Sequence, residues 1–189
     1  MIENKNKNIH KQKVVNFISG PGVGKSLVSS LVYAELKMKH ISTEIIPEYA
    51  KWLVYTGNTE ALNDQYHVSM EQYNRLKVLK GKVEYIIGDS GLFTGLYYNR
   101  KYTGNHSDKD KTEKMIISHN EEFDNIYIYL QRNPAFPFEK NGRVHSEKES
   151  KQIDLELLDL LDKYNINYLE VMSDKSSIEK IIEYIMNDF

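Results

Sequence analysis

The sequence predicts an α/β domain in which a five-stranded, mainly parallel sheet carries helices on both faces. Three observations predict it. Short runs of β-branched and aromatic residues alternate with amphipathic segments, a glycine cluster directly follows the first run, and 189 residues with 40% hydrophobic content suit one domain. Parallel strands need crossover connections, which place helices outside the sheet. Ligands of such sheets bind at the carboxyl ends of the strands, so functional residues are sought there.

Each element follows from a local pattern. Strands are expected over residues 13–18, 44–47, 83–88, 126–130 and 167–171. Helices are expected over residues 26–39, 48–55, 60–80 and 107–119, and from Ser146 and Ser176 onward. Ser107, Ser146 and Ser176 each have an acidic residue three positions later, the pattern of a helix capping box. Residues 1–12 are interpreted as a flexible leader and residues 13–189 as a single domain.

Composition excludes several function classes. Twenty-five basic residues against 27 acidic ones give a net charge of −2, so no bulk positive field favours a nucleic-acid partner. The absence of cysteine excludes disulfides, thiolate catalysis and cysteine zinc sites. No apolar run reaches the length of a membrane span, so we expect a cytoplasmic protein. Whether the protein forms a homodimer is left open.

The segment Ser19 to Ser26 reads SGPGVGKS and matches the phosphate-loop pattern, except that Ser19 replaces the first glycine. Its glycines allow backbone amides to turn inward around a polyphosphate, Lys25 would reach the outer phosphates, and the Ser26 hydroxyl would face magnesium. A dinucleotide fingerprint is disfavoured because its third glycine would fall at Lys25. The pattern predicts a P-loop NTPase fold that binds ATP and Mg²⁺. The residues expected to bind the nucleotide are Gly20, Pro21, Gly22, Val23, Gly24, Lys25, Ser26 and Arg132.

Two acids at strand ends are candidates for the chemistry. Glu48 follows the second strand and is expected to orient or deprotonate an acceptor hydroxyl, with Trp52 one turn later to stack on a planar acceptor. Asp89 ends the third strand and is expected to help hold magnesium with Ser26. An exchange of roles between the acids stays open. The structural alternatives are a glutamate that only opens a helix and an aspartate that only makes a turn.

A proline-containing loop of about fifteen residues after the fourth strand is expected to act as a lid. Arg132 and Arg143 bracket it, and arginine is scarce in this sequence, which has only two others, Arg75 and Arg100. Guanidinium groups match phosphate oxygens, so both loop arginines are candidates to close over the nucleotide, with Arg143 favoured for catalysis. Arg100 is a candidate to meet an acceptor phosphate or base, although an aromatic surface loop explains it equally well.

These motifs resemble a known family in their order. The phosphate loop, the sequence from Pro47 to Ala50, the Asp89-Ser90 strand end and the stretch from Leu130 to Arg143 look like the NadR-type ATPase/kinase family, an AAA-like phosphate-loop domain family that includes ribosylnicotinamide kinase. The resemblance covers most of residues 13–186. It implies a five-stranded parallel sheet, ATP with magnesium, and transfer to a nucleoside-like hydroxyl.

The Pro47-Glu48 pair followed by Trp52 is also similar to deoxynucleoside kinases, whose matching glutamate is the acceptor base. This similarity supports Glu48 over Asp89 for that role. We therefore expect ATP-dependent phosphoryl transfer to a small nucleoside-, nucleotide- or ribosylnicotinamide-like acceptor. Two alternatives remain, a regulatory nucleotide-binding ATPase or GTPase without a small acceptor and a polynucleotide end kinase.

Overall fold

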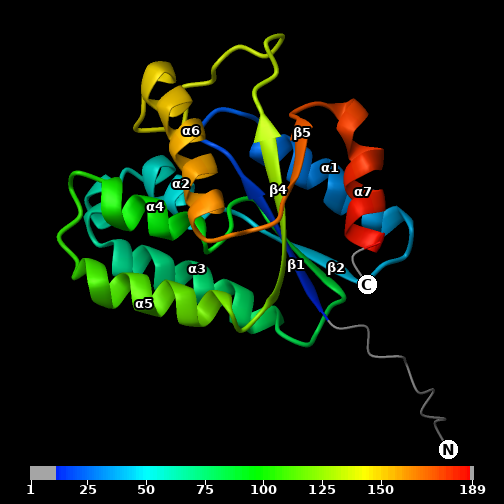
Figure 1. Ribbon diagram of the computed structural model, residues 1–189, viewed down its shortest axis with the longest axis horizontal. Helices are drawn as coiled ribbons and strands as arrows, with labels where there is room; N and C mark the ends of the chain where they lie inside the picture. Colours follow the sequence, from blue (N-terminus) through cyan, green and yellow to red (C-terminus); the bar gives the residue numbers. More distant parts are fainter. Residues whose placement is uncertain (1–11, 188–189) are drawn as a thin grey trace, which may run out of the picture.

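The computed structural model describes residues 12–187, and a five-stranded parallel sheet forms its centre (Figure 1). The strands are β1 (Lys13–Ile18), β2 (Thr43–Ile46), β3 (Tyr85–Gly88), β4 (Asp124–Gln131) and β5 (Leu169–Met172). Their order is β2-β3-β1-β4-β5, with every neighbouring pair parallel. The predicted α/β fold with five parallel strands is confirmed.

Helices cover both faces of this sheet (Figure 1). They are α1 (Lys25–Met38), α2 (Tyr49–Tyr55), α3 (Gln65–Leu79), α4 (Thr94–Lys101), α5 (Lys109–Asn120), α6 (Glu147–Lys163) and α7 (Ile178–Asn187), with 3-10 turns η1 (Thr59–Asn63) and η2 (Lys175–Ser177). Helices α1 and α7 share one hydrophobic cluster with the sheet, and α3, α4, α5 and α6 share the other. The carboxyl ends of the strands are left open between these layers.

Strand β1 shows why the core divides in this way. Val14 and Ile18 belong to the cluster on the α3–α6 face, whereas Val15 and Phe17 belong to the cluster on the α1/α7 face. Successive side chains of a strand point to opposite faces, so a strand covered on both faces is largely apolar; the buried exception in β1, Asn16, is hydrogen-bonded. These four side chains are at most 1% exposed, which holds β1 in the middle of the sheet.

Several predicted helix starts differ from the structure. Residues 60–80 do not form one helix, because η1 ends at Asn63 and Asp64 then caps α3 by accepting a hydrogen bond from His67 N. Asp108, not Ser107, caps α5. Asp174, not Ser176, accepts the backbone hydrogen bonds that open the last helical segment. In each case a nearby aspartate, one residue after Ser107 and two residues before Ser176, competes successfully, because a carboxylate is a strong acceptor for helix N–H groups.

Two further expectations concern Ser146 and the leader. The Ser146–Glu149 capping box is confirmed by reciprocal hydrogen bonds at the start of α6. Of the predicted leader, residues 1–11 lie outside the described residues. Gln12 is held in place, since its Nε2 donates to the carbonyls of Leu79 and Val83, at 2.8 Å each.

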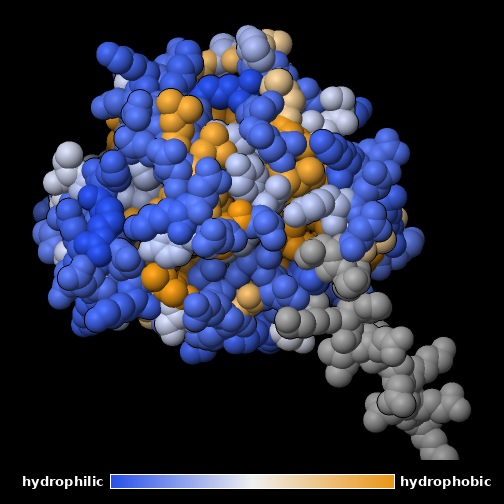
Figure 2. Space-filling view, viewed as in Figure 1, coloured by the Kyte–Doolittle hydropathy of each residue, from blue (hydrophilic) through white to orange (hydrophobic). Residues whose placement is uncertain are grey.

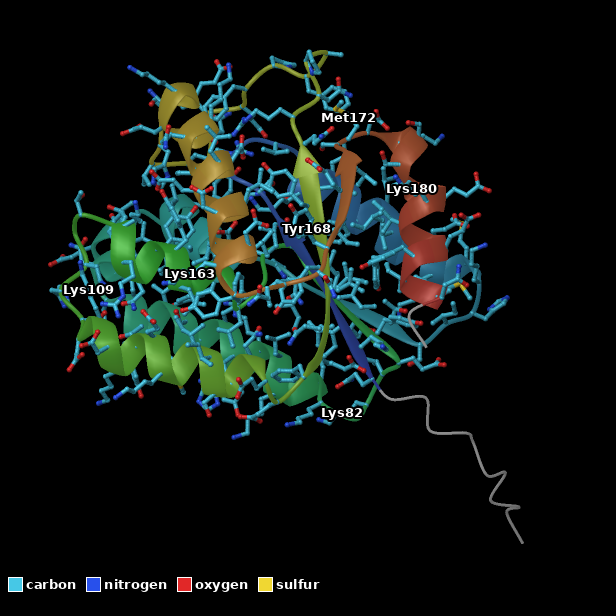
Figure 3. All side chains as sticks on the ribbon, viewed as in Figure 1. Lys82, Lys109, Lys163, Tyr168, Met172 and Lys180 are labelled. Carbon is cyan, nitrogen blue, oxygen red and sulfur yellow. The ribbon has the colours of Figure 1, made fainter. Side chains whose placement is uncertain are left out.

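Figure 2 shows a mainly hydrophilic face on which hydrophobic residues form small, separate groups. In Figure 3, the labelled lysines Lys82, Lys109, Lys163 and Lys180 lie on different sides of the molecule. Between residues 12 and 187, none of the helices combines the length and apolar character that spanning a membrane requires.

Candidate active site

The loop between β1 and α1 has the backbone conformation expected of a phosphate cradle. Gly22 has φ 80° and Gly24 has φ 109°, in the left-handed region that favours glycine. Both are also closely packed: a Cβ on Gly22 would lie 2.5 Å from Phe138 Cε2, and one on Gly24 would lie 2.5 Å from Ser173 Oγ. Gly24 directly precedes α1, so the N–H groups that open this helix are available beside the loop.

Lys25 lies at the centre of this loop. Its Nζ donates hydrogen bonds to the carbonyl oxygens of Ser19 (2.8 Å) and Gly20 (3.1 Å). Burial lowers the pKa of Lys25 from its ordinary value of 10.5, while the nearby carboxylates of Glu48 and Asp89 act in the opposite direction. The amine is therefore held on the loop and surrounded by the acids that the sequence singled out.

Arg132 fastens the phosphate loop to α6. Its Nε forms an ion pair with Asp154 Oδ2 at 2.5 Å, and its Nη2 donates to Ser150 Oγ (2.5 Å) and to the Pro21 carbonyl (3.3 Å). Asp154 Oδ1 accepts a hydrogen bond from Gly20 N at 2.7 Å, and the Ser150 hydroxyl donates to the Pro21 carbonyl. We call these three side chains, Arg132, Ser150 and Asp154, the loop clamp. The predicted nucleotide contact of Arg132 stays a prediction, and its contacts here are to protein groups.

Ser26, Asp89 and Lys51 form a chain of hydrogen bonds next to the loop. Ser26 Oγ donates to Asp89 Oδ2 at 2.7 Å, and Lys51 Nζ donates to Ser26 Oγ at 2.8 Å. The other carboxylate oxygen, Asp89 Oδ1, is buried and has no hydrogen-bond partner among residues 12–187. Asp89 directly follows β3 and Lys51 belongs to α2, so two elements bring these groups to one place.

This set of oxygens fits magnesium. Mg²⁺ prefers a carboxylate together with phosphate and water oxygens over a cage made only of protein groups. The unpaired Asp89 Oδ1 and the Ser26 hydroxyl supply such ligands. The described part of the chain has no group of three or more His, Cys, Asp or Glu side chains arranged around one point.

Glu48 lies just before α2, with its carboxylate free of protein partners. Across residues 12–187 it makes no hydrogen bond or ion pair, and it does not cap the helix that it precedes. Burial raises the pKa of Glu48 above its ordinary value of 4.5, the charge of Asp89 adds to this, and the charges of Lys25, Lys51 and Arg143 oppose it. Glu48 stands at the N-cap position of α2, so the alternative, a glutamate that only opens a helix and is favoured by its dipole, rests on this position and not on a capping hydrogen bond.

The loop after β4 covers the phosphate cradle. The Phe138 ring packs on Gly22, and the Arg143 guanidinium lies 6.0 Å from the centroid of that ring. Arg143 Nη1 donates to the Glu139 carbonyl and to the Asn141 carbonyl at 3.1 Å. Its Nη1 also lies 3.5 Å from Glu139 Oε2, and its charge acts on both Glu48 and Lys25. A lid role for this loop stays a prediction.

Two predicted acceptor contacts lie elsewhere. Trp52 is 61% exposed and does not line the cavity described below. Arg100 makes ion pairs with Asp110 (2.7 Å) and Glu113 (2.6 Å) on the surface of α4 and α5. Trp52 points away because α2 is amphipathic, and it is Leu53 that is buried. Neither side chain is placed to meet an acceptor here.

A cavity of about 230 Å³ connects these groups with a region that the sequence did not reveal. At one end it is lined by the phosphate loop, Glu48, Asp89 and Arg143. The other end, which we call the acceptor end, is formed by η1, α3, α4 and neighbouring residues. Its lining residues are Leu62, Gln65, Val68, Ser69, Gln72, Leu92, Thr94, Gly95, Tyr98 and Tyr102. Lys51 could have been found by its helical spacing from Glu48, but the acceptor-end residues share no motif.

The chain matches a family model described as an AAA domain over residues 14–180. Among solved structures, it is similar to deoxyadenosine kinase from M. mycoides bound to dCMP and dCDP, with 16% identity, a TM-score of 0.57, and coverage of 93% of this chain and 97% of that one. It is also similar to Chaetomium thermophilum Kti12 in complex with ADP-AlF3, with 12% identity, a TM-score of 0.54 and the same coverage. No curated protein sequence matches the chain.

Proposed function

The chain belongs to this AAA domain family, and from that membership we propose that it is a P-loop kinase which transfers a phosphoryl group from ATP to a hydroxyl of a small nucleoside-like acceptor. The observation that carries the proposal is the Glu48 carboxylate, which makes no hydrogen bond or ion pair among residues 12–187 and lines the same cavity as Lys25. The similarity in fold to a deoxyadenosine kinase and the sequence resemblance to NadR-type kinases and deoxynucleoside kinases support it.

The residues of the phosphate loop would hold and orient ATP. Backbone N–H groups of the loop and of the first turn of α1 would donate to phosphate oxygens, and Lys25 would exchange the Ser19 and Gly20 carbonyls for the outer phosphates. Arg143, brought in by the covering loop, would place a second charge beside the transferring group and exclude water. Bound magnesium would neutralise charge on the phosphate oxygens, with Ser26 and Asp89 holding it.

Glu48 would accept the proton of the acceptor hydroxyl as that oxygen attacks the γ-phosphorus; the bond from this phosphorus to the β–γ bridging oxygen breaks, and ADP leaves. A general base must reach the proton that it takes and have a pKa near the working range. Burial raises the pKa of Glu48, and the lack of protein partners leaves its oxygens available to a hydroxyl. Asp89 is less suited to this step because one of its oxygens is engaged by Ser26.

The test measures ADP release with a panel of nucleoside acceptors. Lys25→Ala should abolish turnover while thermal unfolding shows a folded protein. Glu48→Gln should lose the chemical step and still bind ATP with magnesium, whereas Asp89→Asn should weaken the magnesium dependence. If Asp89→Asn alone lost the chemical step with nucleotide binding intact, Asp89 would be the base. ATP hydrolysis that no acceptor stimulates would instead indicate a regulatory ATPase.

A further inference from the structure

We propose that Lys51 is a catalytic residue of the phosphoryl transfer: its ammonium group contacts the γ-phosphate of ATP and stabilises the negative charge of the transferring group. This inference deepens the proposed function and rests on it. Lys51 belongs to none of the sequence motifs described above. Its role follows from the group that it contacts, from the ion pair that it lacks, and from its place beside Glu48.

The Lys51 side chain reaches from α2 to the end of the phosphate loop. Its Nζ donates a hydrogen bond to Ser26 Oγ at 2.8 Å, although the two residues belong to different helices. The hydroxyl at this position of a phosphate loop belongs beside the β- and γ-phosphates, since the ion that it holds bridges oxygens of both. An ammonium group next to this hydroxyl is therefore close to the position of the γ-phosphate.

No carboxylate pairs with Lys51. Among residues 12–187 its Nζ forms no ion pair, and the neutral hydroxyl of Ser26 is its one hydrogen-bond partner. The side chain is half-buried, so its charge is partly shielded from water. An ammonium group has three N–H donors, and two of them stay available to an anion. By contrast, Lys101 on α4 is engaged by Glu156 at 3.4 Å.

Lys51 and Glu48 lie together at the start of α2. Glu48 immediately precedes the helix, Lys51 follows three positions later, and both line the same cavity as the phosphate loop. Residues three apart are neighbours on one face of a helix. The positive charge of Lys51 also lowers the pKa of Glu48, which agrees with this placement. A γ-phosphate that meets an acceptor hydroxyl beside Glu48 is thus also beside Lys51.

Three positive side chains surround the phosphate loop from separate elements. Lys25 is held at the start of the loop by hydrogen bonds to two of its carbonyl groups. Arg143 Nε lies 3.6 Å from the position that a Cβ on Gly22 would take, in the middle of the loop. Lys51 meets Ser26 at its end. The transferring group spreads its charge over three equatorial oxygens, so cations on several sides stabilise it more than a single cation can.

The part of Lys51 in the reaction is electrostatic. The acceptor oxygen forms a bond to the γ-phosphorus, the bond from this phosphorus to the β–γ bridging oxygen breaks, and ADP leaves. The proton of the acceptor hydroxyl goes to Glu48. Lys51 keeps its three protons throughout and donates hydrogen bonds to a non-bridging oxygen of the γ-phosphate.

The first experiment measures nucleotide binding by calorimetry, with magnesium and without an acceptor, so it does not depend on catalysis. The probes are ADP and a non-hydrolysable imido analogue of ATP. Lys51→Met should weaken binding of the analogue about 10-fold and binding of ADP less than about 2-fold, because ADP lacks the γ-phosphate. Retained ADP binding also shows that the variant is folded.

Lys51→Arg tests whether the charge is responsible. A guanidinium group also binds phosphate oxygens, so this variant should keep the affinity for the analogue within about 3-fold of wild type. An affinity as low as that of Lys51→Met would overturn the inference. Equal weakening of ADP and analogue binding by Lys51→Met would also overturn it, because Lys51 would then only support Ser26 and the loop. Unchanged binding of both nucleotides would overturn it as well.

Lys180→Met is the matched control. Lys180 is exposed on α7 and does not line the cavity, and its replacement changes the net charge by the same amount (Figure 3). Both nucleotide affinities should equal those of the wild type. A loss of analogue affinity as large as that in Lys51→Met would overturn the inference, because the net charge alone would then explain the effect.

The second experiment measures ADP release with the nucleoside acceptor that gives the highest wild-type rate. Lys51→Met should lower kcat about 100-fold, the scale of removing one donor aimed at charge that develops in the transition state. The KM for the acceptor should change less than about 3-fold, since Lys51 contacts the transferring phosphate and not the acceptor. An unchanged kcat would overturn the inference.

These results separate the two proposals. Selective loss of analogue binding in Lys51→Met, in a protein that transfers phosphate to no acceptor, would refute the kinase and keep the contact between Lys51 and the γ-phosphate. Phosphoryl transfer by the wild type with an unchanged kcat in Lys51→Met would keep the kinase and refute the role of Lys51.

Discussion

The loop clamp should stabilise the protein as a coupled unit, and Asp154→Ala is the change that tests it. This substitution leaves the Arg132 guanidinium without its carboxylate and the Gly20 N–H without its acceptor. Removing one partner of a buried ion pair costs about 3 to 5 kcal/mol. The side chains of Arg132 and Asp154 are 22% and 11% exposed, so the lower part of that range applies.

With the lost hydrogen bond to Gly20 included, we expect the free energy of unfolding to fall by about 3 kcal/mol. For a chain of this size, that change lowers the melting temperature by about 6 to 12 °C. Calorimetry and urea unfolding measure both quantities. ADP affinity should fall as well, because the clamp fixes the backbone at Gly20 and Pro21.

A double-mutant cycle supplies the control. Arg132→Met alone should also lower the free energy of unfolding. The double variant leaves neither buried charge unpaired, so it should lower that free energy by at least about 1 kcal/mol less than the sum of the two single changes. Asp159→Ala on the exposed side of α6 should change stability by less than about 0.5 kcal/mol. If the effects of Asp154→Ala and Arg132→Met simply added, the two side chains would not act as a unit.

Three further predictions concern the site itself. Since burial raises the Glu48 pKa above 4.5, kcat/KM should fall as the pH drops through that raised pKa. The free energy of unfolding should instead decrease as the pH rises from 4.5 through the raised pKa, because the folded state disfavours the charged carboxylate. Urea unfolding of Glu48→Gln across pH should lack this decrease, and an unchanged pH profile would refute the raised pKa of Glu48. Lys51→Met removes a positive charge that lowers the Glu48 pKa, so the acid limb of the kcat/KM profile should move to higher pH. A shift to lower pH would contradict this charge interaction between Lys51 and Glu48. Gly22→Ala places a Cβ at φ 80° and 2.5 Å from Phe138 Cε2, so ATP affinity should drop at least 10-fold by calorimetry, and wild-type affinity would show that the loop tolerates a side chain there.

The fold could be predicted from the sequence because its signals are local. Each strand is a short apolar run, and a strand buried on both faces needs nothing else to be recognised. Helix starts were harder, since a serine and a neighbouring aspartate carry the same capping signal and the chain uses Asp108 and Asp174. Helix α4 lies within a stretch rich in aromatic residues and glycine for which no helix was predicted.

The candidate site was predictable only where a motif marks it. The phosphate loop, Glu48 and Asp89 follow from spacing and from their positions at strand ends. Asp154 could not be predicted in this way, because its role depends on a hydrogen bond to Gly20 that joins residues 134 positions apart. Trp52 was assigned to the site, but the rotation of α2 turns it outward.

The loop clamp also bears on how the protein is made. Gly20 and Pro21 are synthesised before the side chains that hold them, which are Arg132 after β4 and Ser150 and Asp154 on α6. Contacts between such distant residues form late, because the loop entropy of the intervening chain must first be overcome. The nascent chain therefore carries a glycine-rich loop that lacks its support until most of the domain has been synthesised. Acquisition of nucleotide affinity would then mark the end of folding, not its beginning.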